Sequence, residues 1–278
     1  MSRIEDYALI GDTHSAALVG LDGSIDWLCL PRFDSRACFA AILDTERGGR
    51  WRLAPDGPSQ ATRAYRRDSL VLETTFSTRD GEVVITDCLP FEEGSQPGNP
   101  REIHTEDLVV RIVTGVSGTV RMEMDYSPRF DYGYVMPWFR VGGHGIHAIG
   151  GPDALYLQAQ VPLRLNRSNV TAAFEVGAGE SVAFVAGYHW SYRDPRDVAP
   201  EGCFELVRST DEFWKRWAAQ FDYSGRWRDE IMRSLLTLKA LTYSPTGGIV
   251  AAPTTSLPEA IGGPRNWDYR YCWLRDAT

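Results

Sequence analysis

The feature that most constrains the fold is a succession of short β-type runs between residues 7 and 192. Polar and apolar residues alternate at 70–76 and 120–126, and residues 108–113 form a nearly continuous apolar run. Turn residues recur roughly every ten positions, and no long segment with helical spacing interrupts them. This pattern predicts a mainly β fold, a large antiparallel β-sandwich (supersandwich).

Local signals add detail to this β region. Apolar runs at 17–19 and 25–30 flank a turn in which Gly23 can adopt positive φ, so we expect a hairpin. Residues 92–100 are rich in Gly and Pro and predict an exposed loop. Aromatic residues and glycines gather at 131–147, which favours a hairpin whose aromatics fill one end of the sandwich; a sugar platform is the alternative. His144 and His147 lack a third ligand at metal-binding spacing, so no metal site is predicted.

The pattern becomes helical after residues 195–200. Residues 209–212 have the form of a capping box, and aromatic residues follow at helical spacing, which predicts a linker helix over 203–222. A second helix over 226–243 would bury one apolar face made of Trp227, Ile231, Leu235, Leu238 and Leu241. The predicted division is therefore a β-sandwich domain at 1–202, the linker helix at 203–222 and a further helical unit at 223–278.

Composition excludes some classes of partner and suggests a compartment. A net charge of −8 and a pI near 5.2 do not suit a nucleic-acid or anionic-membrane surface. The five cysteines are scattered without a Cys-x-x-Cys pair, which favours buried thiols in a reducing compartment. The first residues are acidic where a signal peptide needs an apolar run, and no stretch reaches membrane-spanning length. We therefore expect a cytoplasmic protein.

The final stretch, 262–278, carries the clearest chemical signal. Trp267, Tyr269, Tyr271 and Trp273 alternate with polar residues and lead into the pair Arg275 and Asp276. Aromatic faces beside a guanidinium and a carboxylate suit a sugar, whose C–H face packs on a ring while its hydroxyls form hydrogen bonds. The alternative is a packed, aromatic-rich helix start with surface ion pairs, and residue chemistry alone favours that alternative.

Two long motifs resemble one known family. The segment RNWDYRYCWLRD (265–276) is similar to the signature that opens the catalytic (α/α)6 barrel of the glucoamylase and trehalase-like glycoside hydrolases, family 15. The segments YALIGDTH (7–14) and GSIDWLCLPRFDS (23–35) resemble the trehalase-like N-terminal β-domain of prokaryotic members. The resemblance implies that 223–278 is the start of a truncated (α/α)6 barrel, because such enzymes continue for several hundred residues.

The resemblance also implies an activity and a set of site residues. Such enzymes invert configuration and use two glutamates as acid and base. Those glutamates lie downstream, so we expect no catalytic residue within this chain and no activity from the chain alone. Position in the motif makes Asp276 an acceptor for the 4- and 6-hydroxyls of glucose, and gives Asp268 and Arg270 a structural ion pair. The implied substrate-binding residues are Tyr269, Trp273, Arg275 and Asp276.

The sequence gives less information about the substrate, the cofactor and the oligomeric state. The trehalase-like motif favours trehalose, with maltooligosaccharides second. No cofactor is predicted; magnesium and phosphate dependence is implied only for some members of the subgroup. The dense N-terminal aspartates, among them Asp12, are typical of turns and not of catalysis. The alternative to an enzyme is a non-catalytic β-sandwich that serves as a scaffold or carbohydrate-binding module. Its helices would then fold back on the sandwich, pair between chains as a homo-oligomer, or be poorly ordered.

Overall fold

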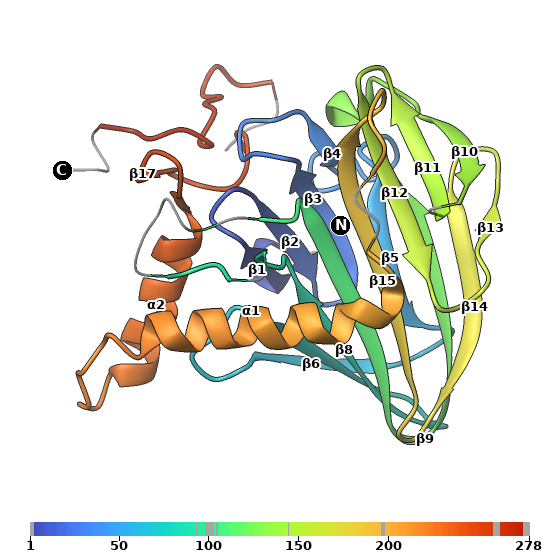
Figure 1. Ribbon diagram of the computed structural model, residues 1–278, viewed down its shortest axis with the longest axis horizontal. Helices are drawn as coiled ribbons and strands as arrows, with labels where there is room; N and C mark the ends of the chain where they lie inside the picture. Colours follow the sequence, from blue (N-terminus) through green and yellow to red (C-terminus); the bar gives the residue numbers. More distant parts are fainter. Residues whose placement is uncertain are drawn as a thin grey trace.

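The protein is built on two antiparallel layers that share one long strand (Figure 1). The computed structural model describes residues 3–92, 94–97, 103, 105–143, 145–195, 198–257 and 262–274. Strand β9 (Leu108–Ser127) pairs through its first half with β8 and β15 and through its second half with β5 and β14. The mainly β architecture with few helices is thus confirmed.

The first layer holds β1 (Tyr7–Gly11), β2 (Ala16–Gly20), β3 (Ser24–Cys29), β4 (Ala37–Phe39), β5 (Arg50–Pro55), β13 (Arg164–Leu165) and β14 (Val170–Gly177). The second layer holds β6 (Gln60–Tyr65), β7 (Leu72–Ser77), β8 (Gly81–Cys88), β10 (Trp138–Gly142), β11 (Gly145–Gly150), β12 (Asp153–Ala159) and β15 (Ser181–Trp190). Short 3-10 turns lie at η1 (Ile4–Asp6), η3 (Asp131–Gly133) and η4 (Pro200–Gly202), and a small hairpin joins β16 (Thr242–Tyr243) to β17 (Gly248–Ile249).

The predicted N-terminal hairpin is confirmed. Strands β2 and β3 pair antiparallel, and Gly23 in the turn has φ 78°. A side chain at Gly23 would collide with the backbone carbonyl of Leu53, so a glycine is required for both conformation and space.

The centre of the sheet contains a buried charge. Arg111 lies in the apolar run of β9 with no exposed surface, and its Nε donates to Asp87 Oδ1 at 2.8 Å. Its other N–H groups donate to the backbone carbonyls of Trp51 (2.7 Å) and Gly23 (2.8 Å). A guanidinium with a carboxylate and two carbonyls is well satisfied, which is the condition under which a buried charge is tolerated.

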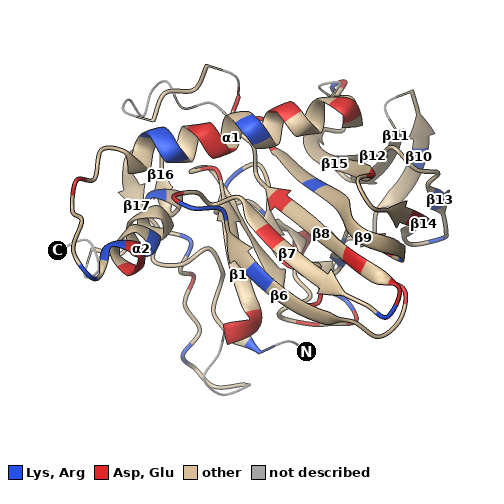
Figure 2. Cartoon of the chain, turned by 90° about the horizontal axis from the view of Figure 1, so that it is seen from below, with Lys and Arg blue, Asp and Glu red and all other residues tan. Residues whose placement is uncertain are grey.

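In the described part of the chain, two α-helices follow the large sheet. Helix α1 (Cys203–Ala218) lies along β9 and β15, and its Phe213 ring stacks on Phe91 with centroids 3.7 Å apart. Figure 2 shows acidic and basic residues alternating along α1; these include the exposed Arg208, which pairs with Glu205 and Glu212. Within the described residues, no helix is both long and apolar enough to span a lipid bilayer.

The predicted buried face of the second helix is confirmed only at its last member, Leu241, which is buried. Helix α2 (Arg228–Ala240) buries Met232, Leu236 and Ala240 against the first helix and the sheet region. Three members of the predicted stripe are exposed instead: Trp227, Ile231 and Leu238. The helical spacing in the sequence predicts the helix itself, but α2 carries two apolar stripes and the described chain mainly covers the one through Met232 and Leu236.

The aromatic-rich stretch 131–147 also departs in part from expectation. It forms a hairpin of β10 and β11, and Phe139 packs on the core as predicted. Tyr134 and Trp138 do not fill the sandwich end, because they are 87% and 58% exposed. His144 lies outside the described residues, and His147 Nδ1 lies 3.2 Å from His189 Nε2. The predicted loop at 92–100 lies partly outside the described residues.

Candidate functional site

The aromatic motif near the C-terminus docks on the N-terminal layer as an irregular segment. Residues 262–274 contain no helix, so the alternative of a packed helix start is wrong over these residues. The backbone N–H groups of Ala251 and Ala252 donate to the carbonyls of Tyr271 (3.1 Å) and Tyr269 (2.9 Å). The segment is therefore held from one side by the loop that follows β17.

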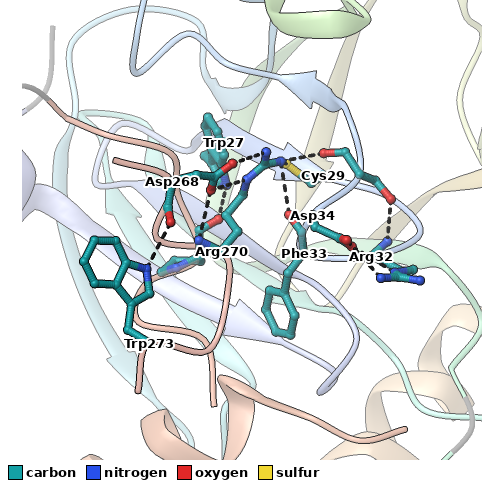
Figure 3. Close-up of polar contacts among 10 residues, drawn as sticks. Trp27, Cys29, Arg32, Phe33, Asp34, Asp268, Arg270 and Trp273 are labelled. Atoms are coloured by element: carbon teal, nitrogen blue, oxygen red, sulfur yellow. Dashed lines mark hydrogen bonds and ion pairs between the residues drawn. The ribbon is translucent and has the colours of Figure 1, made fainter. Parts of the chain in front are cut away.

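Arg270 anchors this segment from the other side (Figure 3). Its side chain is buried, and its Nη2 lies 2.7 Å from Asp268 Oδ2 while its Nε lies 3.0 Å from Oδ1. Its Nη1 donates to the carbonyls of Ser35 (2.6 Å) and Phe33 (3.2 Å). The ion pair expected for Asp268 and Arg270 is present, and it also joins the two motifs that lie at opposite ends of the chain.

The loop after β3 is shaped to receive this guanidinium. The Phe33 N–H donates to the His14 carbonyl at 2.8 Å, and Arg32 forms a two-pronged ion pair with Asp34 at 2.9 Å. These contacts fix the loop so that two carbonyls point toward Arg270. A second link comes from Trp27, whose Nε1 donates to the Pro253 carbonyl at 2.7 Å.

Two groups beside the Arg270 guanidinium differ in charge: the Asp268 carboxylate is ionised, and the Cys29 thiol is neutral. Burial by itself raises the pKa of Asp268, but hydrogen bonds from Arg270 outweigh it and lower that pKa below its ordinary value. Burial raises the pKa of the Cys29 thiol to about 12, and this sulfur lies 3.5 Å from Arg270 Nη1. Asp268 is therefore the anionic partner of Arg270, and Cys29 remains a neutral thiol.

The anchor positions the aromatic side chains of the motif. The Tyr269 and Trp273 rings are half-buried and stack with centroids 5.5 Å apart and an interplanar angle of 19°. Trp273 Nε1 donates to the Asp268 carbonyl at 3.1 Å, so the indole is tied to the anchored residue pair. Two of the predicted substrate-binding residues are thus brought together. Arg275 and Asp276 lie outside the described residues.

A small pocket opens between the motif and the loop after β3. It measures about 230 Å³, and Arg32, Asp34, Tyr243, Arg270 and Tyr271 are among its lining residues. Arg32 lies over the Tyr243 ring at 5.3 Å from its centroid. The predicted site residues do not include Arg32, Asp34 or Tyr243, although the first two lie in the N-terminal motif.

The predicted turn role of the N-terminal aspartates is confirmed for Asp12. Its buried Oδ1 accepts from the backbone N–H groups of His14 (2.9 Å) and Ser15 (2.7 Å). Burial raises the pKa of Asp12 to about 7. The Thr13 carbonyl accepts from Ser244 N, so this loop lies against the chain that follows α2. Among the described residues, no three His, Cys, Asp or Glu side chains come together as a metal cluster.

Both motifs lie within segments that match models of known protein families. The family model described as trehalase-like, N-terminal, matches residues 1–174, and that of the glycosyl hydrolases family 15 matches residues 225–278. The trehalase of Mycolicibacterium smegmatis is 38% identical over 294 residues, which cover 99% of this chain and 43% of that protein. The trehalase of Thermoplasma volcanium is 34% identical, with 99% and 43% covered.

The fold has a relative of known structure. A crystal structure of a bacterial glucoamylase complexed with acarbose matches 99% of this chain and 46% of that one, with a TM-score of 0.67 and 11% identity. This likeness shows a shared fold. The chain spans less than half the length of the curated relatives it matches. Since the trehalase-like N-terminal model covers more than half of the sequence, the chain belongs to that family, as its motifs predict.

Proposed function

We propose that the chain is the N-terminal portion of an inverting glycoside hydrolase that releases glucose from an α-linked substrate. The observation that carries this proposal is the anchored motif, in which Arg270 ties the stacked Tyr269 and Trp273 to the N-terminal layer. The similarity to proteins named trehalase over nearly the whole chain supports it. No acid or base is assigned within these residues, since family resemblance implies two glutamates further along the chain.

The proposed division of labour follows the elements. Residues 1–202 would form the β-sandwich domain, 203–222 the linker helix, and 223–278 the start of the (α/α)6 barrel. In support, the strands of the large sheet end with β15, helix α1 begins at Cys203, and the family 15 match begins at residue 225. For the location we propose the cytoplasm, supported by acidic composition and by five free thiols.

Four residues would hold the glucose ring. Tyr269 and Trp273 would present their rings to its C–H face, and their stacking keeps those rings in one orientation before the sugar arrives. Arg275 and Asp276 would donate to and accept from its hydroxyls, with charge-assisted hydrogen bonds of about 1.5–3 kcal/mol each. Such bonds raise the rate only when they strengthen as the sugar distorts toward the transition state.

Trehalose is the proposed substrate, and maltooligosaccharides are the second choice. The trehalase relatives support the first, and the glucoamylase likeness extends only to the fold. Glucose release from trehalose and from maltose, measured on the protein expressed from its whole open reading frame, distinguishes them. A higher kcat/KM for maltose than for trehalose would reverse the choice.

The residue assignment is tested in the same protein. Asp276→Ala is expected to lower kcat/KM at least a hundredfold, which corresponds to about 2.7 kcal/mol of lost transition-state stabilisation. Arg121→Ala, on the exposed part of β9, serves as a matched control and should retain full activity. A near-wild-type kcat/KM for Asp276→Ala would contradict the sugar-binding assignment. If the wild-type protein releases no glucose from either substrate, the proposed hydrolase activity is wrong.

A further inference from the structure

A cleft of about 460 Å³ lies in the β-sheet part of the molecule, between the loop after β3 and the ends of β12 and β15. Its size falls within the range of about 300–1,000 Å³ found for small-molecule sites. Ser35 and Arg36 line one side, Phe130 is a buried residue of its lining, and Asp153, Tyr188 and Trp190 line the other. None of the motif residues Tyr269 and Trp273 lines this cleft.

Sheet register explains why the polar and aromatic groups meet here. Asp153 on β12 is the direct cross-strand partner of Trp190 on β15, and Tyr188 lies two residues earlier on the same face. The Tyr188 hydroxyl donates to Asp153 Oδ1 at 2.8 Å. The Tyr188 and Trp190 rings meet edge to face with centroids 5.7 Å apart, so both side chains are held in place.

The aromatic surface continues into solvent. The Tyr192 ring stacks on Trp190 with centroids 6.0 Å apart and an angle of 19°. Trp190 is 39% exposed and Tyr192 is 71% exposed. Rings that served only to fill the core would be buried, as Trp27 and Trp51 are in this sheet. The stacked pair instead leaves aromatic surface exposed to solvent beside the cleft.

Charged groups on both sides of the cleft complete the chemistry. The Asp153 side chain uses one oxygen to accept from the Tyr188 hydroxyl and keeps further acceptor capacity, because a carboxylate has about four lone-pair positions. Arg36 is largely exposed and makes a loose ion pair with Asp131 at 3.7 Å, so it retains N–H donors. An aromatic face, a carboxylate and a guanidinium together match the C–H face and the hydroxyls of a pyranose.

We propose that this cleft is a saccharide-binding site that holds a glucose-type pyranose against Trp190, with its hydroxyls on Asp153 and Arg36. The site goes beyond the proposed hydrolase activity and does not depend on it, since its residues all belong to the β-sheet layers and the loops between them. It would let the β-sandwich hold a glucose-containing ligand in its own right.

The site is tested by direct binding and not by turnover. The protein, expressed from its whole open reading frame with 5-fluorotryptophan, is titrated with D-glucose, and the Trp190 fluorine resonance is assigned as the one that Trp190→Phe lacks. We expect a saturable shift of this resonance with a dissociation constant of about 1–50 mM. Sorbitol, which has the hydroxyls without the ring face, should produce no saturable shift. The resonance of Trp138, which is exposed on β10, should not move.

Two variants make the outcome decisive. Asp153→Asn keeps the shape and the Tyr188 hydrogen bond but removes the charge, and should weaken glucose binding about tenfold. Asp276→Ala should leave the Trp190 titration unchanged. The proposal is overturned if the Trp190 resonance does not saturate, if sorbitol acts as well as glucose, or if Asp276→Ala abolishes the shift. Because no step requires hydrolysis, an inactive protein with a normal Trp190 titration would reject the proposed function and leave this site standing.

Discussion

Two buried arginines show how differently the same side chain is used in two regions of this molecule. Arg111 sits at the centre of the sheet with Asp87 and two carbonyls, and both charged side chains are sealed from solvent. Arg270 makes a similar set of contacts with Asp268 and two carbonyls, but Asp268 is 35% exposed. The first pair lies inside the fold, and the second lies where a separate segment meets it.

The difference in setting predicts a difference in role. Arg111 on β9 joins strands β5 and β8 and the turn before β3, so its loss would disturb the sheet as a whole. Arg270 joins one motif to one loop, and the sequence separation between Arg270 and Ser35 is 235 residues. We infer that Arg111 mainly stabilises the fold, whereas Arg270 mainly positions the candidate sugar-binding residues beside it.

The largest expected effect is at the centre of the sheet. Arg111→Met leaves the Asp87 carboxylate buried without its cation, so the free energy of unfolding should fall by about 3–5 kcal/mol. Urea denaturation followed by circular dichroism measures this loss. The double variant Arg111→Met with Asp87→Leu removes both charges and should regain part of it. If the free energy of unfolding of Arg111→Met falls by less than about 1 kcal/mol, this pair does not stabilise the fold as proposed.

Asp12 extends the comparison to a buried carboxyl group without an arginine partner. Among the described residues, its hydrogen-bond donors are backbone N–H groups and no charged side chain. Its pKa is raised to about 7, mainly by burial, against about 3.9 in an unfolded chain. Between these values the folded state holds a proton that the unfolded state has lost, so stability falls as pH rises from about 4 to 7. The decline is up to about 1.4 kcal/mol per pH unit.

Asp12→Asn should remove that decline, because the amide keeps the acceptor for His14 and Ser15 and cannot ionise. Urea denaturation at several pH values compares the two proteins. Asp107, whose pKa is raised to about 6 by burial, adds a decline of the same sign to both proteins, and its charge also contributes to the raised pKa of Asp12. Parallel stability curves for wild type and Asp12→Asn would show that Asp12 does not titrate in this window.

A smaller loss of stability is expected at the anchor. Arg270→Met leaves Asp268 partly exposed, so water can replace the lost partner, and the free energy of unfolding should fall by about 1–3 kcal/mol. Urea denaturation under the conditions used for Arg111→Met gives the ranking directly. If Arg270→Met destabilises the protein as much as Arg111→Met does, the two arginines share one structural role and the comparison fails.

The smallest effect is expected on the surface of β9. Arg121 and Asp56 approach to 3.9 Å, with 67% and 41% of their side chains exposed. Arg121→Ala should therefore change the free energy of unfolding by less than about 0.5 kcal/mol. This variant sets the lower bound of the series. A change above about 1 kcal/mol would mean that exposure is a poor guide to the importance of an arginine here.

The parts of the fold that the sequence predicted are those governed by neighbouring residues. Alternation and turn spacing predicted the antiparallel sheet, and Gly23 marked a hairpin that the structure contains. The burial of Arg111 could not be predicted in this way. Its carboxylate partner is 24 residues away, and its carbonyl partners are 60 and 88 residues away. An arginine in an apolar run gives no local sign of which distant groups will satisfy it.

Helix α2 shows the same limit for packing. Its sequence contains a stripe through Ile231 and Leu238 and another through Met232 and Leu236, and spacing alone cannot choose between them. The second stripe is buried because the side chains of Leu70, Phe91 and Phe213 lie on that side. At the candidate site, family resemblance identified the aromatic residues, but the anchoring loop at Phe33 and Ser35 emerged only from the tertiary contacts.

The most direct test of the positioning role is the activity of Arg270→Met on trehalose. The protein from the whole open reading frame is assayed where denaturation curves show both wild type and variant to be folded, so that stability does not enter. We predict a fall of at least tenfold in kcat/KM, about 1.4 kcal/mol, as the Tyr269 and Trp273 pair loses its anchor. An unchanged kcat/KM would contradict the claim that the N-terminal layer positions these residues.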